Sequence, residues 1–210
     1  MTLMHGNWRL SIRSKDHPTF VLDDREVASG STWDAGTLQL SAGSRLVLRV
    51  TGSGADKLEF LVYDARDRFV TGVGSLVGPP RSDLLAPGDY VLVARGDGVA
   101  APAQPFSIAA GKDTELEVQA QAGVRQRFEF ESASGNELSR AGYRLLRDGR
   151  IAFCNFASVN ESGALVDEVS LLPGSYTLTV RDTEPGLDLH GTCAFVVGNE
   201  PGQVVRVALR

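Results

Sequence analysis

One motif occurs three times along the chain, and it constrains the fold more than any other feature of the sequence. Residues 84–95 (LLAPGDYVLVAR) and 170–181 (SLLPGSYTLTVR) match almost position for position, and a shortened copy, residues 6–13 (GNWRLSIR), lies near the start. In each copy, apolar residues alternate after an aromatic residue, and an arginine comes five places after it. The aromatic residues Trp8, Tyr90 and Tyr176 are 82 and 86 residues apart. This spacing fits whole β-sandwich domains and is too long for a small solenoid repeat.

The motif predicts a tight turn followed by a half-buried strand. Proline fixes φ and glycine tolerates a positive φ, so Pro-Gly favours a turn, and the alternating apolar residues after it are typical of a strand. An aromatic residue at the start of that strand is placed for a tyrosine corner, in which the ring enters the core and the hydroxyl bonds to nearby backbone. Trp8 has no hydroxyl, so the first copy cannot make this bond.

Segments on both sides of the motif also repeat, and they predict an all-β chain. Two strands follow each copy, and the two full copies are preceded by further strands with polar turns, of which Asp148-Gly149 is a strong hairpin signal. No stretch of a dozen residues has helical periodicity with caps. We therefore expect tandem antiparallel β-sandwiches, transthyretin-like or immunoglobulin-like, at 44–121 and 122–210, with a partial β repeat at 1–43.

The partial repeat lacks the first strands of a unit, so its own strands have unpaired edges. It either packs on or extends the 44–121 domain, or a partner chain supplies the missing strands by β-augmentation. The linker at 119–123 is too short to be free, so the two domains are expected to touch. The expected strands lie near residues 7–13, 19–22, 37–41, 45–51, 58–63, 68–73, 89–95, 105–109, 114–119, 125–131, 140–147, 150–157, 165–171, 175–181, 192–197 and 203–209.

The Leu-x-Pro-Gly-x-Tyr-x-Leu stretch, followed by a loop, a Phe-x-Ile/Val strand and a final Leu-x-Val strand, resembles the carboxypeptidase regulatory-like, transthyretin-like (prealbumin-like) β-sandwich modules of bacterial proteins. The resemblance covers both complete units and the partial one. It implies a non-catalytic accessory, spacer or binding domain and carries no catalytic residues. Pilin-type Cna B modules share the turn, and they can hold a Lys–Asn isopeptide bond. Residues 122–210 contain no lysine, which excludes that bond there.

Composition narrows the classes of partner and location. The 210 residues are 42% hydrophobic with a formal net charge of −5, and acids and bases are interspersed, whereas nucleic-acid binding needs a concentrated basic face. No apolar run reaches the roughly 20 residues that cross a bilayer, so no membrane insertion is expected. No signal peptide is visible in the chain as written, which predicts the cytoplasm. If the chain is a piece of a longer exported protein, the prediction becomes the periplasm or the outside of the cell.

Residues with chemical potential are few. His5, His17 and His190 stand alone without metal-ligand spacing, so no metal site, cofactor or enzymatic activity is expected. The acidic loop 182–188 matches no EF-hand pattern and is interpreted as solvated. Cys154 and Cys193, the two cysteines, both lie in the last unit. They either form an inter-sheet disulfide or remain buried free thiols.

Candidate binding residues come from the repeat and from aromatic side chains. Arg13, Arg95 and Arg181 recur at one place in the motif, where they bind an anion or a partner carboxylate, or pair with a neighbouring aspartate. Trp33 lies in a polar loop and either contacts a partner or folds over the core edge. Other aromatic residues that could stack on sugars, but fit the core better, are Tyr63, Phe69, Tyr143 and Phe156.

The sequence therefore predicts a non-enzymatic protein-interaction or scaffold module. Its binding surfaces would be the sheet edges of residues 1–43 and the loops at 74–83, 96–104 and 182–191, the second of which is rich in Gly, Ala and Pro and expected at the surface. The partner would be a protein of unknown identity, with association through edge strands as one mode. The alternatives are a carbohydrate-binding or adhesive accessory module of an exported protein, and a hydrolase accessory subunit.

Overall fold

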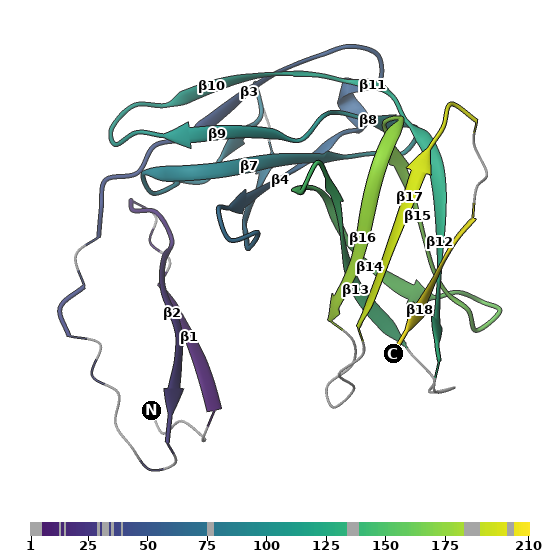
Figure 1. The fold of residues 1–210 in the computed structure, drawn as a ribbon. Helices are drawn as coiled ribbons and strands as arrows, with labels where there is room; N and C mark the ends of the chain where they lie inside the picture. Colours follow the sequence, from purple (N-terminus) through teal and green to yellow (C-terminus); the bar gives the residue numbers. More distant parts are fainter. Residues whose placement is uncertain are drawn as a thin grey trace.

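The computed structural model is all-β, as the repeat predicts. Strands form the regular structure, and the described helical residues are confined to one 3₁₀ turn, Ala55–Lys57. The strands build two tandem seven-stranded bodies and a separate N-terminal hairpin (Figure 1). The residues that the structure describes are 6–12, 14, 16–28, 30, 34, 36–38, 40–74, 78–133, 139–182, 190–200 and 204–210.

The two bodies have the same strand topology. The spatial order is β10-β3-β6-β5-β4-β7-β9 in the first domain and, read in the same sense, β18-β12-β15-β14-β13-β16-β17 in the second. In each domain the first and last strands pair in parallel, while the other neighbouring pairs are antiparallel. The strands of the first domain are β3 (Leu46–Thr51), β4 (Glu59–Asp64), β5 (Phe69–Gly74), β6 (Arg81–Ser82), β7 (Gly88–Arg95), β9 (Gln104–Ile108) and β10 (Thr114–Gln119). Those of the second are β12 (Val124–Ser132), β13 (Arg140–Arg147), β14 (Arg150–Val159), β15 (Leu165–Leu171), β16 (Gly174–Asp182), β17 (Gly191–Val197) and β18 (Val204–Leu209).

Each sheet folds over on itself around one core. The core of the second domain contains buried side chains from all seven of its strands, among them Phe128, Leu145 and Leu178. The outermost strands β17 and β18 approach each other at one end, where His190 and Arg210 exchange two backbone hydrogen bonds of 3.0 Å. The first domain has the equivalent core around Leu46, Leu48 and Val62.

The repeated turn explains why the motif is so well matched. Gly88 and Gly174 both have φ 154°, a conformation that L side chains rarely adopt, so glycine is needed at this position. The tyrosine corner is confirmed in both full copies, because the hydroxyl of Tyr90 donates to the Ala86 carbonyl and that of Tyr176 to the Leu172 carbonyl, each at 2.8 Å.

The N-terminal segment keeps one strand pair of the unit. β1 (Gly6–Ile12) and β2 (Phe20–Val27) pair antiparallel, and within the described ranges they share no sheet with the two domains. Their connection reaches the first domain, since buried Pro18 leaves no room for a Cβ at Gly43. The strand expected at 37–41 is not formed at residues 37, 38, 40 and 41. In a full unit this last strand pairs with the first strand, and the partial repeat has no first strand to pair with.

Two predictions about the first domain were wrong. The short strand β6 was missed, because two residues after a Gly-Pro-Pro turn give no readable alternation. The segment at 96–105 is not a simple surface loop. Its residues Val99–Ala100 form β8, which pairs with β11 (Gln121–Ala122) in the linker, and Val99, Ala100 and Ala101 are all buried.

The tyrosine corner gives a test of how much one side-chain-to-backbone hydrogen bond stabilises a domain. Tyr176→Phe leaves the buried Leu172 carbonyl without its donor, so we expect a loss of about 1–2 kcal/mol in the free energy of unfolding. Tyr90→Phe should cost less, because Tyr90 is only partly buried and water can replace the hydroxyl. Urea unfolding of both variants measures this. An unchanged stability for Tyr176→Phe contradicts the assigned role.

Candidate functional site

The junction between the two domains is the most elaborate constellation in the described part of the chain. A small apolar cluster, here called the seam, joins them: Tyr63 and Val93 from the first domain and Ile151 from the second are buried together. Leu61, Val91, Ala103, Leu146 and Cys154 pack against these three residues. The faces of β4 and β7 that point away from their own core are thus covered by β13 and β14.

Hydrogen bonds surround the seam. Arg144 Nη1 lies 2.7 Å from Asp67 Oδ2 across the junction, and the Gly98 amide donates to Ser170 Oγ at 2.9 Å. The linker is held to the same loop, because the Gly123 amide donates to the Gly98 carbonyl at 3.0 Å. The segment 96–104, expected to present itself to a partner, is therefore used to fix one domain on the other.

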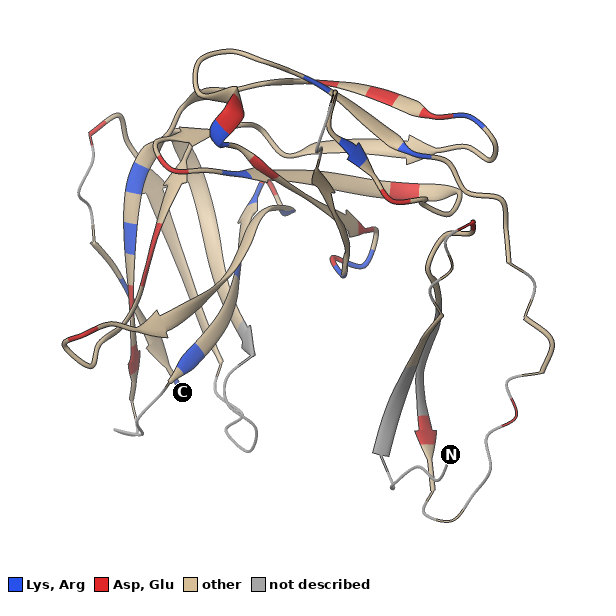
Figure 2. Cartoon of the chain, turned by 180° about the vertical axis from the view of Figure 1, so that it is seen from behind, with Lys and Arg blue, Asp and Glu red and all other residues tan. Residues whose placement is uncertain are grey.

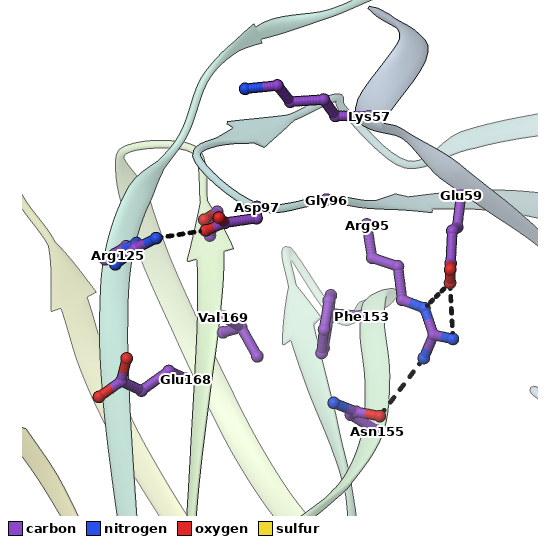
Figure 3. A pocket seen from close by; sticks show the side chains of 11 residues that line it. Lys57, Glu59, Arg95, Gly96, Asp97, Arg125, Phe153, Asn155, Glu168 and Val169 are labelled. Carbon is purple, nitrogen blue, oxygen red and sulfur yellow. Dashed lines mark hydrogen bonds and ion pairs between the residues drawn. The ribbon is translucent and has the colours of Figure 1, made fainter. Parts of the chain in front are cut away.

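Arg95, one of the repeated arginines, forms hydrogen bonds on both sides of the junction. Its Nε donates to Glu59 Oε2 on the adjacent strand at 2.8 Å, and its Nη1 donates to Asn155 Oδ1 of the second domain at 3.3 Å (Figure 3). Of the two roles considered for the repeated arginine, this pairing matches the one in which it pairs with a neighbouring acidic residue, although that residue is a glutamate and not the expected aspartate.

Behind Asn155 lies a half-buried carboxylate. Asp167 Oδ2 accepts hydrogen bonds from Asn155 Nδ2 at 2.7 Å and from the Tyr143 hydroxyl at 2.5 Å. Burial raises the pKa of Asp167, and the hydrogen bonds from Tyr143 and Asn155 offset this only in part. Burial, followed by the neighbouring Asp167 charge, raises the pKa of Tyr143 well above its usual value, so Tyr143 remains a donor. These contacts extend a single chain of polar groups from Glu59 in the first domain to Tyr143 in the second.

Of three grooves at the junction, the one lined by residues that include Ala101, Arg147 and Tyr176 measures about 690 Å³. The two others are both lined in part by Arg95. One, of about 470 Å³, is lined by charged residues, including the pair Arg125–Asp97, whose Nη2 and Oδ1 atoms are 2.6 Å apart (Figure 3). The other, of about 620 Å³, is more aromatic and is lined by Tyr63, Phe69 and Phe156 with Asp67 and Arg144. Residues of both charge signs are distributed along the strands of both domains (Figure 2).

The edge strands of the two domains differ in a way that bears on binding. β9 is the edge strand next to β7 in the first domain, and β17 is its equivalent next to β16 in the second. Pro105 of β9 pairs with Val91, the residue after Tyr90. Ala194 of β17 pairs with Thr177, the residue after Tyr176. Ala194 is therefore the counterpart of Pro105. β17 carries no charged residue, and its Val196 is 61% exposed. Proline and charge are the usual protections of an open edge, and β17 has neither.

The disulfide considered for Cys154 and Cys193 is not formed, and both residues are in the thiol form. Cys193 packs against the core of the second domain, whereas Cys154 packs on the seam. The two side chains thus lie against different clusters. The alternative of two cysteines without a disulfide therefore holds, but both side chains are only partly buried and not buried as expected.

The other predicted site residues are placed only in part. Trp33 and Arg13 lie outside the described residues, as does most of the acidic loop at 182–188, and for Arg181 the structure describes the backbone in β16 alone. Within the described ranges, no cluster of His, Cys, Asp and Glu could hold a metal ion. The same ranges contain no helix with the length and apolar character of a membrane span.

Sequence reasoning missed the chain of polar groups around Asp167 and the three grooves. Asn155 and Asp167 are separated in sequence and belong to no motif, so only the pairing of β14 with its neighbours brings them together. The burial of segment 96–104 had a signal, since Val99, Ala100 and Ala101 form an apolar run inside an otherwise Gly- and Pro-rich stretch.

Comparisons with known proteins add no family assignment. No protein-family model matches the chain, and no curated protein matches it. Among solved structures it is similar to the Bacillus anthracis TIE protein, with 16% identity and a TM-score of 0.32, over 90% of this chain but only 37% of that one. It is also similar to a streptococcal ancillary pilin (15% identity, TM-score 0.28, 99% of this chain and 76% of the other). A third is the shaft pilin SpaA of Lactobacillus rhamnosus GG (12% identity, TM-score 0.31, 80% and 97%).

The seam predicts how the domains are coupled. Ile151 is 1% exposed and fills the space between the domains, so Ile151→Ala should cost about 2–4 kcal/mol and separate the unfolding of the two domains into distinct steps. Val159→Ala on the same strand is the control, since Val159 is 43% exposed and should change stability by less than about 0.5 kcal/mol. Calorimetric unfolding distinguishes the two variants. Equal effects would refute the seam as the coupling element.

The carboxylate behind Asn155 predicts a pH dependence of defined sign. Because the folded-state pKa of Asp167 is raised, the folded protein binds this proton more tightly than the unfolded chain. Wild type should therefore gain stability relative to Asp167→Asn as the pH falls from 7 through the raised pKa, with the full gain below the unfolded value of about 3.9.

Asp64 provides the opposite control. Burial tends to raise the pKa of its carboxyl, but hydrogen bonds from Arg68 and Arg66 outweigh burial and lower it. The advantage of wild type over Asp64→Asn should thus be present above about pH 3.9 and disappear as the pH falls through the lowered pKa. Urea unfolding across this range measures both slopes. Parallel slopes for the two variants would contradict the assignment.

Proposed function

We propose that the chain is a non-catalytic protein-interaction or scaffold module, in which two coupled sandwiches present the open edge of β17 to an extended segment of a partner protein. The sandwiches would be of the carboxypeptidase regulatory-like, transthyretin-like kind. Binding would occur by β-augmentation, with backbone hydrogen bonds to β17 and contacts to its exposed side chains.

The observation that carries this proposal is the exchange of Pro105 for Ala194 at equivalent edge positions. A proline fits an edge strand only where its missing N–H would have pointed away from the sheet. By the same register, the Ala194 amide would point away from β16, where an added strand could accept a hydrogen bond from it. Val196 is exposed where the first domain has Ser107, so the edge also offers apolar contact.

Coupling of the domains supports the scaffold part of the proposal. The seam and the bonds around Arg95 keep β17 at a set orientation relative to the first domain. A partner that contacts both domains would then bind without the entropic cost of ordering a flexible linker. In this proposal Trp33, Arg13 and Arg181 supply additional contacts, and the hairpin of residues 1–43 provides a second open edge.

The carbohydrate-binding or adhesive alternative keeps its own test. It goes with an exported location, and retention of the protein on a polysaccharide column would favour it. The interaction proposal, by contrast, places the protein in the cytoplasm.

The edge proposal is tested by Ala194→Pro, which copies the first domain onto the second. The substitution removes an outward amide and no ladder bond, so the fold should be retained while partner capture falls by about tenfold or more. Quantitative pull-down from source lysate, followed by hydrogen exchange at β17 in the purified complex, measures this.

Two matched proteins complete that experiment. Ser107→Val makes the same exposed edge position of β9 apolar without removing Pro105, and it should not change capture. Residues 44–210 without the hairpin should fold and reveal how much the N-terminal edge contributes. Undiminished capture by folded Ala194→Pro would reject β17 as the binding edge.

A further inference from the structure

Two of the aromatic side chains that line the groove beside Tyr63 are exposed to solvent. Phe69 comes from β5 of the first domain and Phe156 from β14 of the second, and each is 53% exposed. These are the exposed large aromatic residues of the described part of the chain, and both line the same groove of about 620 Å³. Two exposed phenylalanines meeting at one groove are an apolar surface of the kind that marks a binding site.

Most polar side chains that line this groove already form hydrogen bonds or ion pairs within the protein. Arg144 is paired with Asp67, and Asn155 bonds both Arg95 and Asp167. The Tyr143 hydroxyl donates to Asp167. A ligand with many hydroxyls, such as a sugar, would find few free hydrogen-bonding partners here. An apolar side chain needs none.

Charge beside the groove favours an acidic neighbour for that side chain. The Arg140 guanidinium lies over the Phe156 ring, 5.2 Å from its centroid. Within the described residues, no carboxylate forms an ion pair with Arg140, whereas Arg95 and Arg144 both have one. A cation above an exposed aromatic ring attracts a carboxylate at the groove mouth, although the whole chain is net negative.

We propose that this groove binds an aromatic side chain of a partner protein segment that carries a carboxylate next to it. The side chain packs between Phe69 and Phe156 on a floor formed by Leu61 and Tyr63, and the carboxylate faces Arg140. The inference rests on the proposed interaction function and deepens it, because it assigns a sequence preference to a site separate from the β17 edge.

Three capped pentapeptides test the assignment: Gly-Glu-Phe-Glu-Gly, Gly-Lys-Phe-Lys-Gly and Gly-Glu-Ser-Glu-Gly. Titration into the ¹⁵N-labelled full chain should shift the amides of Phe69, Gly142 and Asn155, with the acidic Phe peptide binding at least about tenfold more tightly than the other two. Arg140→Glu should reverse the preference between the acidic and the basic Phe peptide.

Matched variants separate binding from folding. Phe69→Ser and Phe156→Ser alter exposed side chains and should weaken the acidic Phe peptide about tenfold or more. Val159→Ser changes an exposed residue of the same strand β14 outside the groove lining and should bind like wild type. Ala194→Pro should also bind the peptide normally, because the edge and the groove are separate.

Two outcomes overturn the assignment: no saturable shift at the groove with the acidic Phe peptide, or a galacturonic acid trisaccharide shifting these amides where the peptides do not. If either result is found while partner capture still depends on Ala194, the groove is rejected as a binding site and the proposal for the β17 edge is retained. If partner capture does not depend on Ala194 but the acidic Phe peptide binds the groove as expected, only the proposal for the β17 edge is rejected.

Discussion

Burial of Val93 and Ile151 against each other is the contact on which the rest of the molecule depends. It turns two sandwiches that each have a complete core into one body, and it brings Arg95 within hydrogen-bonding distance of Asn155. Both grooves lined in part by Arg95 exist because the seam holds their two walls together. A flexible linker between the same domains would leave neither the aromatic groove nor the charged one.

The duplicated units have diverged where they face solvent and each other, and have kept what closes the sandwich. The positive-φ glycine, the tyrosine hydroxyl bond and the strand order are the same in both. The edge strands are not, since Pro105 in one corresponds to Ala194 in the other. The first set closes each sandwich, and the exchange at the edge is the observation on which the proposed binding by β17 rests.

Alternation and turn chemistry made most of the fold predictable. The all-β class and most strands follow from them, because a half-buried strand has apolar and polar residues in alternation, and this alternation is visible in the sequence. The tyrosine corners were predictable because Tyr90 and Tyr176 each follow a Pro-Gly turn at the start of a strand. The strand expected at 37–41 was wrong because a strand also needs a neighbour. β6 was missed because two residues carry no period.

The candidate site was far less predictable than the fold. The role of Arg95 was readable only as a choice between a ligand and a strand neighbour, and its link to Asn155 depends on how two domains dock. Asp167 and Tyr143 come together through strand pairing in the second sheet, and no local sequence pattern predicts their hydrogen bond. Sequence reasoning favoured the core for Phe69 and Phe156, but both are 53% exposed, so that expectation was wrong.

The parallel pairing of the first strand with the last has a consequence for how the protein is made. β3 must wait for β10, and β12 for β18, so neither sheet can be completed until nearly its whole unit has left the ribosome. Contacts between segments so distant in the chain require costly loop closure and are expected to form slowly. During synthesis the first sandwich can close while the second is still being translated, and its finished surface then offers β14 a template on which to dock.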